Sequence, residues 1–305
     1  MKKIRKVFKN MSIILYNILP AFIYIHIFYL FSYIINDLTV RKVAKKHSLK
    51  RLRQFPKGSI VKSDTLFILG SGSSICDLNE EQWEVIKSKD SLGLNFWLYH
   101  DFVPTFYVYE ESLDPNRNSQ FYNILNLKKG PYKNTPFIVK DIEYKGITFK
   151  KVPIELRKNL YLSTEMVIFG DKISFSKFLI KGYSYINFIN RKNPRVFLKK
   201  SGSLSYLLLL AENLGYQNIV LCGIDLNNSN YFYYESKYRH YSIPNNYVEA
   251  KHHHPTDVET KKNIPISHVV LEINEQILKK QGINLYVGSK NSALFPSLKC
   301  YFDEI

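Results

Sequence analysis

Apolar runs that end at glycine or polar turns recur along the chain from residue 64 onward. Segment 64–69 (DTLFIL) stops at the turn 70–74 (GSGSS), the pattern of a buried strand that enters a tight turn. Asn79 and the acidic residues after it then begin a helical pattern carried by Trp83, Val85 and Ile86. Further strands are expected over 91–98, 105–109, 136–139, 218–222 and 284–287.

Two helices are each followed by a glycine and a strand. Segment 203–214 is closed by Gly215 before the strand at 219–222, and 266–281 is closed by Gly282 before 285–287. Helices that alternate with apolar strands predict an α/β fold with a doubly wound, mostly parallel sheet. We therefore expect a single Rossmann-like domain over 61–305. Segment 226–263, rich in Asn, Tyr, His and Lys, is predicted to be a lid.

The front of the chain has a different pattern. Segment 12–35 contains no Asp, Glu, Lys or Arg over 24 residues, which is long enough for a membrane helix. Asn17, Pro20, His26 and many aromatic residues also suit a helix lying in the interface, so spanning and interfacial arrangements both stay open. Residues 1–60 are thus predicted to be a membrane anchor with a basic linker. A slight excess of basic residues after the apolar stretch favours an inner-membrane protein whose C-terminal domain, the catalytic domain if the chain is an enzyme, faces the cytoplasm.

The net charge of +17 is concentrated at this front end. Thirteen Lys and Arg residues and one Asp precede residue 60, leaving about +5 for the rest of the chain. This distribution favours anionic lipid over nucleic acid as a partner. Three widely spaced cysteines without a CxxC pair indicate reduced thiols rather than a zinc or redox site.

Several polar positions fall where predicted strands end. The turn that contains Gly70, Ser71, Gly72 and Ser73 brings backbone N–H groups to the carboxyl edge of the sheet, where phosphate binds in nucleotide-binding folds. It lacks the full GxGxxG fingerprint, so a plain structural turn is an equal alternative. Asn95 ends the next strand and is a candidate to bind a base or ribose, or a plain turn residue.

Two later segments add charge at the same edge. Lys199, Lys200, Ser201 and Gly202 precede an apolar helix, where cationic side chains and free N–H groups would favour phosphate. Gly223 and Asp225 end another strand. Asp225 is a candidate to position an acceptor, hold a ribose hydroxyl or cap a turn, and it lacks the second carboxylate of a DxD metal motif.

The run His252-His253-His254-Pro255-Thr256-Asp257 is the most unusual cluster. Three consecutive histidines cannot all face one metal in a regular element, so no metal is expected. One histidine acting as a general base is a simpler interpretation, because an imidazole with a pKa near the working pH can take the proton of an acceptor hydroxyl. A solvated loop without chemistry is the alternative.

The order of these motifs resembles the bacterial lipooligosaccharide sialyltransferases, glycosyltransferase family 42, which use CMP-activated sialic acid. The resemblance runs from Leu66 to Leu298 and is carried by 68–74 (ILGSGSS), Asn95-Phe96, Ser201-Gly202, 214–225 (LGYQNIVLCGID), His252 with Thr256-Asp257, and Asn291-Ser292. It implies a glycosyltransferase A-like variant of the Rossmann-like fold. It also implies inverting transfer without a metal or other cofactor, and a homo-oligomer.

The resemblance also assigns roles. It implies that His252 is the general base, or His253 or His254 if the spacing to Thr256 is shifted. It implies that Tyr233 contacts the leaving phosphate. The family's Asn residues are replaced by Ser71 in the turn and by Glu110 after a strand, its first phosphate tyrosine is Asn227, and Lys199 or Lys200 stands near the place of an Arg.

These features predict a membrane-associated transferase that moves a sugar from a CMP-activated donor to a lipooligosaccharide or capsule acceptor. Sialic acid, another nonulosonic acid and 3-deoxy-manno-octulosonic acid all remain candidates for the sugar. A transferase that uses a UDP- or GDP-sugar is an alternative. A membrane-attached nucleotide-binding protein without activity is another.

Overall fold

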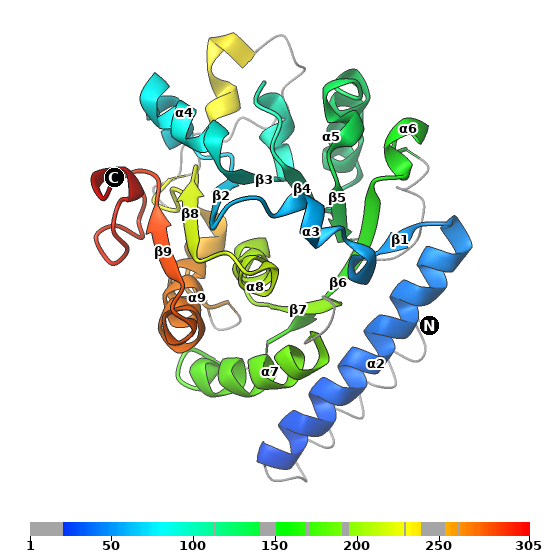
Figure 1. Cartoon of the computed structure of the whole chain (residues 1–305). Helices are drawn as coiled ribbons and strands as arrows, with labels where there is room; N and C mark the ends of the chain where they lie inside the picture. Colours follow the sequence, from blue (N-terminus) through cyan, green and yellow to red (C-terminus); the bar gives the residue numbers. More distant parts are fainter. Residues whose placement is uncertain are drawn as a thin grey trace.

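Nine parallel strands form one sheet in the computed structural model, which describes residues 21–112, 114–140, 151–168, 171–190, 195–228, 230–238, 254–260 and 263–305 (Figure 1). The strands are β1 (Lys50–Arg51), β2 (Thr65–Leu69), β3 (Asp90–Leu94), β4 (Phe106–Glu110), β5 (Phe137–Lys140), β6 (Leu160–Val167), β7 (Val196–Lys199), β8 (Asn218–Cys222) and β9 (Asn284–Val287). The predicted parallel α/β sheet is therefore confirmed, and the fold is Rossmann-like.

The winding of the sheet reverses beside β2. The strand order is β1-β6-β5-β4-β3-β2-β8-β9, and β7 pairs with the second half of β6. The chain lays β3 to β6 on one side of β2 and then crosses back to place β8 and β9 on its other side. In open α/β sheets, ligands bind outside the carboxyl ends of the strands at such a reversal. The boundary between β2 and β8 is therefore the expected place for a ligand.

Helices cover both faces of the sheet (Figure 1). They are α2 (Ala21–His47), α3 (Lys57–Ile60), α4 (Glu80–Ser88), α5 (Pro115–Leu127), α6 (Ile154–Arg157), α7 (Phe175–Asn190), α8 (Ser203–Leu214) and α9 (Ile266–Ile273). Leu66 and Ile68 of β2 belong to a core with α8 and α9, whereas Phe67 and Leu69 belong to a second core with α4 and α5. Alternate side chains of a strand point to opposite faces, so β2 is buried by helices on both sides.

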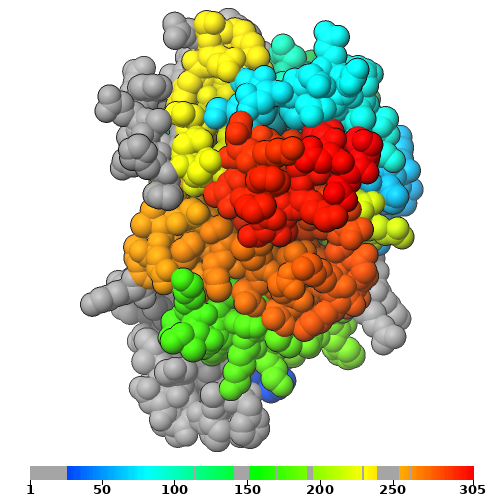
Figure 2. Space-filling model, turned by 90° about the vertical axis from the view of Figure 1, so that its left-hand side faces the viewer, coloured from blue at the N-terminus to red at the C-terminus, as the bar shows by residue number. Residues whose placement is uncertain are grey.

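The C-terminal residues complete the surface near β9. Figure 2 shows them, in red, between the cyan segment around α4 and the orange segment that includes α9. Tyr301 and Phe302 contact Phe67 of β2, with ring centroids 5.4 and 6.2 Å away. The end of the chain therefore contributes to the core over the central strand.

Helix α2 packs on the edge of the sheet through one face. Tyr29 is 1% exposed and donates to the Phe178 carbonyl of α7 at 3.3 Å, and Val40 and Val43 are buried. The helix extends to His47, beyond the predicted end of the membrane segment at residue 35, and β1 follows and pairs with β6. Part of the predicted membrane segment, 12–20, lies outside the described residues. No helix within them is long and apolar enough to cross a membrane.

Local sequence predicted some elements closely and missed others. Helix α8 and strands β8 and β9 have the predicted bounds, whereas β6, β7, α5 and α7 were not predicted. The strand expected over 91–98 ends at Leu94, because Asn95 adopts a positive φ of 50° and turns the chain into a 3₁₀ segment. The helix expected over 266–281 is regular only to Ile273 and continues through a π turn at Asn274–Leu278.

Candidate functional site

A cavity of about 490 Å³ lies at the carboxyl ends of the strands around the reversal. Its wall includes the turn after β2, residues after β3, β4 and β8, the start of α8, and two parts of the predicted lid segment. Its size falls within the range of sites for ligands of nucleotide size. The strand reversal and the cavity thus coincide.

The glycine turn after β2 is fixed by the end of β8. The N–H groups of Gly70 and Gly72 donate to the carbonyls of Cys222 and Gly223, both at 2.8 Å. A Cβ at Gly72 would lie 2.5 Å from Asp225 Oδ2, so any larger residue would displace the turn. The two strand ends therefore approach too closely for side chains, and glycine is required for packing.

Asp225 stabilises the same turn through hydrogen bonds. Its carboxylate accepts hydrogen bonds from the Ser74 backbone N–H at 3.0 Å, from the Ser74 hydroxyl, and from the Ser73 hydroxyl at 3.3 Å. Burial raises the pKa of Asp225, although the Ser74 hydrogen bonds oppose this. The alternative in which Asp225 caps a turn is therefore the one that the geometry supports. Asp225 also lines the cavity.

The start of α8 leaves backbone N–H groups free. Among the described residues, no carbonyl or side chain accepts from the N–H groups of Ser203 and Leu204. Ser201 adopts a positive φ of 60° and its hydroxyl donates to the Ile264 carbonyl, which holds the chain before the helix in place. A helix start with free N–H groups favours an anion.

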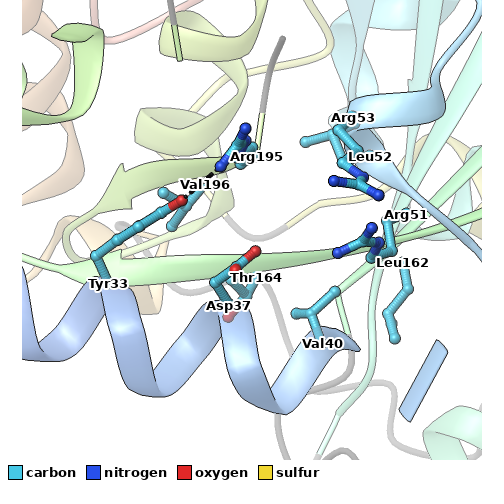
Figure 3. Close-up of a pocket in the computed structure, with 10 residues that line it drawn as sticks. All are labelled: Tyr33, Asp37, Val40, Arg51, Leu52, Arg53, Leu162, Thr164, Arg195 and Val196. Atoms are coloured by element: carbon cyan, nitrogen blue, oxygen red, sulfur yellow. Dashed lines mark hydrogen bonds between the residues drawn. The ribbon is translucent and has the colours of Figure 1, made fainter. Parts of the chain in front are cut away.

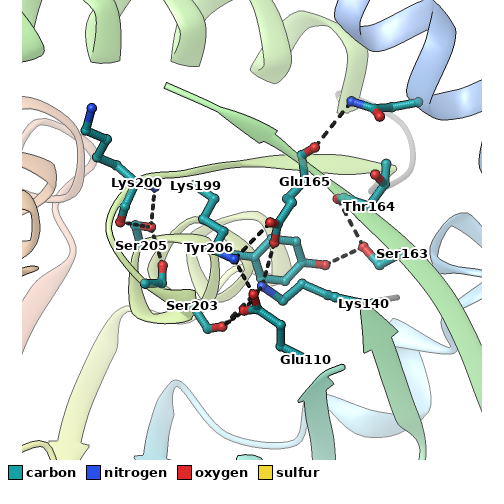
Figure 4. A network of polar contacts seen from close by, with 12 residues as sticks. Glu110, Lys140, Ser163, Thr164, Glu165, Lys199, Lys200, Ser203, Ser205 and Tyr206 are labelled. Atoms are coloured by element: carbon teal, nitrogen blue, oxygen red, sulfur yellow. Dashed lines mark hydrogen bonds and ion pairs between the residues drawn. The ribbon is translucent and has the colours of Figure 1, made fainter. Parts of the chain in front are cut away.

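An ion network lies beside the start of α8 (Figure 4). Lys140 contacts Glu110 at 3.0 Å and Glu165 at 2.8 Å, and Lys199 contacts both carboxylates as well. The Ser203 hydroxyl donates to Glu110. Burial raises the pKa of Glu110, but Lys140 and Lys199 lower it by more, so the carboxylate is ionised. Two cations and two anions leave this part of the wall without net charge.

Aromatic rings and one arginine form another part of the wall. Tyr233 is stacked between Tyr99 and Tyr231, with ring centroids 4.7 and 5.1 Å away. Burial raises the pKa of Tyr233 well above its ordinary value, so its hydroxyl is protonated and can donate a hydrogen bond. The Arg117 guanidinium lies 5.0 Å from the ring centre of Phe96, and no described carboxylate forms an ion pair with it.

His254 reaches the cavity from the second part of the predicted lid. Its backbone N–H donates to the Leu226 carbonyl at 3.0 Å. Its Nε2 lies 3.3 Å from the Tyr231 hydroxyl, and its Nδ1 lies 2.7 Å from Thr256 Oγ1. Burial lowers the pKa of His254 below its ordinary 6.5, despite an opposing effect of Asp257. The imidazole is therefore mainly neutral at pH 7.

The segment that contains Asn291 and Ser292 supports the loop after β8. The Ser292 hydroxyl donates to the Ile224 carbonyl at 2.7 Å, and Asn227 donates to the Asn291 carbonyl at 2.6 Å. The Ala293 N–H donates to the Asp225 carbonyl at 2.7 Å. These bonds fix the backbone from which Asp225 projects into the cavity wall.

Most of the site residues predicted from sequence meet in this cavity. Its lining includes Gly70, Ser71, Gly72, Asn95, Glu110, Ser201, Gly202, Gly223, Asp225 and Tyr233. Ser73 and Lys200 do not line it, and Lys199 does so in place of Lys200. The predicted base His252 lies outside the described residues, as does His253. Within the described residues, no group of three His, Cys, Asp or Glu side chains is placed to hold a metal ion.

Sequence reasoning missed several wall residues. Arg117 and Tyr231 line the cavity, and Lys140 and Glu165 hold its ion network. Arg117 lies one turn into a helix that was not predicted, so no strand end or glycine marked it. Tyr231 had one signal, since it lies two residues before Tyr233 in the aromatic part of the predicted lid.

The fold and cavity define a Rossmann-like protein with a concave site at its strand reversal. Comparison of the chain with models of known families, with curated proteins and with solved structures finds no match. The resemblance to glycosyltransferase family 42 therefore stays an inference from the motifs.

Proposed function

We propose that this chain is an inverting glycosyltransferase that uses a CMP-activated sugar. The donor would be sialic acid or a related nonulosonic or ulosonic acid, and the acceptor a glycan of lipooligosaccharide or capsule type. The reaction would take place at the cytoplasmic face of the inner membrane. The observation that carries the proposal is one cavity at the strand reversal that is lined by a neutral His254, a protonated Tyr233 and the start of α8.

The phosphate of the donor would bind between the start of α8 and Arg117. The free N–H groups of Ser203 and Leu204 and the guanidinium of Arg117 are the groups on the wall that suit an anion. Lys199 also lines the cavity, but its charge is matched by Glu110 and Glu165. A site of this kind stabilises a departing nucleotide with fixed donors and needs no metal ion for that purpose.

His254 would be the general base, in agreement with the shifted spacing that the motif allowed. If Nδ1–H donates to Thr256 Oγ1, then Nε2 carries a lone pair beside the Tyr231 hydroxyl, at the cavity wall. Thr256 N–H also lies 3.3 Å from Nδ1 and would favour the other tautomer, but the hydroxyl contact at 2.7 Å is the shorter one. Nε2 would take the proton of the acceptor hydroxyl as its oxygen attacks the anomeric carbon.

Tyr233 would assist the leaving group. The bond between the anomeric carbon and the phosphate oxygen breaks with its electron pair on the CMP phosphate, which gains negative charge. A buried tyrosine with a raised pKa keeps its proton and can donate a hydrogen bond to that oxygen. Asp225 would act indirectly, by holding the glycine turn through Ser74.

Calorimetry with CMP, UDP and GDP tests the donor class. The proposal expects CMP to bind most tightly, without added divalent metal. Tighter binding of UDP or GDP, or loss of activity in EDTA, would instead support a metal-dependent transferase for those sugars.

The variant His254→Ala tests the mechanism. Turnover should fall by at least about a hundredfold, which is the usual contribution of a general base, while the affinity for CMP stays unchanged. His268→Gln is a matched control, because His268 lies on α9 and does not line the cavity. Unchanged turnover in His254→Ala would assign the base to His252, His253 or another group.

The pH dependence of kcat/KM gives an independent check. A general base acts in its neutral form, so the rate should fall as pH drops through the pKa of His254. Because burial lowers that pKa, the acid limb should lie below pH 6.5. An acid limb above that value would contradict the assignment.

The ion network favours a second candidate, a nucleotide-binding protein without transferase activity. Glu110 and Lys199 line the cavity, but they form an ion pair with each other. Glu110 is also paired with Lys140, and Lys199 with Glu165. Such a protein would bind CMP and neither hydrolyse nor transfer an activated sugar.

A further inference from the structure

Three arginines converge where α2 crosses the edge of the sheet. Arg51 and Arg53 follow α2 in the chain, and Arg195 precedes β7. Figure 3 shows their side chains around one pocket, which Tyr33 and Asp37 of α2 also line. This pocket lies at the edge of the sheet formed by β1, β6 and β7, apart from the cavity at the strand reversal.

The charge of these arginines is not balanced within the described residues. Asp37 is the acidic residue on the pocket wall, and its carboxylate is paired with Arg41 at 2.6 Å. Arg195 donates to the Tyr33 hydroxyl at 3.0 Å, which is a neutral partner. No described group accepts a hydrogen bond from its Nε, which is buried. Three guanidinium groups that face one space repel each other unless an anion lies between them.

The outward face of α2 beside this pocket is also unusual. Leu30, Ile34 and Leu38 repeat every four residues and are 44%, 40% and 56% exposed, and Phe31 next to them is 48% exposed. Arg41, which is paired with Asp37, and Lys45 lie about three and four turns after Leu30 and so continue the same face toward the C-terminal end of the helix. This face is therefore apolar in its first half and cationic in its second.

An anionic bilayer matches both features. The apolar half of such a helix inserts at the boundary between headgroups and acyl chains, and the cationic half is attracted to anionic lipid. Arginine forms paired hydrogen bonds with phosphate oxygens. The pocket itself has a volume of about 10 Å³, the space of about one water, so a phosphate would be held at its mouth between the guanidinium groups.

We propose that Arg51, Arg53 and Arg195 bind the phosphate of an anionic phospholipid while the outward face of α2 lies on the membrane. This site is independent of the proposed sugar transfer. It adds a headgroup contact to the predicted membrane segment 12–35, whose second half lies in α2.

Vesicle binding of the full-length chain tests the site. Partitioning onto phosphatidylcholine vesicles is compared with partitioning onto vesicles that also contain phosphatidylglycerol, and the ratio of the two is the readout. Apolar insertion contributes to both kinds of vesicle, so the ratio isolates the headgroup. In Arg51→Gln/Arg53→Gln/Arg195→Gln, the ratio should fall by about a hundredfold, from the usual contribution of three cations at a membrane surface.

Two further variants keep the test specific. Arg51→Gln/Arg53→Gln leaves the Arg195 contact with Tyr33 intact, and it should lower the ratio by roughly tenfold or more even if the triple variant folds poorly. The control Lys87→Gln/Lys279→Gln/Lys280→Gln removes the same charge from exposed residues of α4 and the segment after α9, and should change the ratio by less than about threefold.

Three results would overturn the proposal. The first is an equal ratio in the native chain and both arginine variants. The second is an equal fall of the ratio in the lysine control, which would mean that net charge alone causes the preference. The third is tight binding of inorganic phosphate, lost in Arg51→Gln/Arg53→Gln, without any preference for phosphatidylglycerol, which would assign the site to a soluble anion.

Discussion

The glycine turn after β2 and the start of α8 both line the cavity and have similar sequences, GSGSS and KSGS. In the glycine turn, the N–H groups of Gly70 and Gly72 donate to the carbonyls of Cys222 and Gly223, and the N–H of Ser74 donates to the Asp225 carboxylate. In the second, the N–H groups of Ser203 and Leu204 have no acceptor among the described residues. Glycine and serine before a helix therefore do not by themselves identify a phosphate site. Only the tertiary structure shows which N–H groups have acceptors and which are free.

The carboxylates of the two regions differ as well. Asp225 supports the glycine turn through hydrogen bonds from uncharged groups, and burial raises its pKa. Glu110 beside α8 contacts two lysines, which lower its pKa against the effect of burial. The carboxylate at the glycine turn is thus held by neutral donors, whereas the one beside α8 is held by cations.

The largest expected effect comes from Glu110→Gln. The variant leaves Lys140 and Lys199 with Glu165 alone, and breaking a buried ion pair in this way should lower the free energy of unfolding by about 3 kcal/mol at pH 7. The folded-state pKa of Glu110 is below its unfolded value, so this stability is present above the unfolded value of about 4.5 and lost as pH falls through the folded pKa. Denaturant unfolding at several pH values should show the two proteins converging in acid. A constant difference would contradict the ion-pair account.

A smaller loss of stability is expected from Gly72→Ala, with Gly202→Ala as its matched control. The new Cβ at Gly72 would meet Asp225 and the Gly223 carbonyl, and overpacking of this kind costs about 1–3 kcal/mol. At Gly202 the backbone is extended and the nearest atom to a Cβ would be 3.6 Å away on Ile266, so stability should stay almost the same. Thermal unfolding measures both. Equal losses of stability in the two variants would contradict the inference that the backbone is packed more tightly at Gly72 than at Gly202.

The smallest effect concerns one N–H group at the start of α8. Ser203→Pro removes the N–H of Ser203 at the first helical position, where proline is tolerated, and Gly202 before it has the extended backbone that proline requires. Ser203→Ala keeps that N–H and removes only the hydroxyl. If the N–H binds a phosphate, CMP should bind about tenfold more weakly to the proline variant than to the alanine variant, by calorimetry. Equal affinities would place the phosphate elsewhere.

The elements that were predicted correctly are specified by residues that lie close together in the sequence. Helix α8 has an apolar pattern that ends at Gly215, whose φ of 91° closes the helix, and β8 and β9 are short apolar runs bounded by polar residues. Alternating helices and strands predicted a doubly wound parallel sheet, but the strand order and its reversal beside β2 were not predicted. Strand β6 was missed because its apolar residues are interrupted by Ser163, Thr164 and Glu165; the Ser163 hydroxyl contacts the Tyr206 hydroxyl, and Glu165 belongs to the ion network. The short apolar run of β7 was not recognised as a strand either.

The sequence by itself determined the class of fold and the strand ends that meet at the cavity, because hydrophobic period, glycine and capping residues act over a few positions. Tertiary structure alone decided which of those residues face the cavity. It brought in Arg117 and Tyr231, placed Lys199 rather than Lys200 on the wall, and showed the glycine turn to be closed by Asp225. The physical reason is that a free N–H group, an unpaired cation or a shifted pKa depends on neighbours far away in the chain.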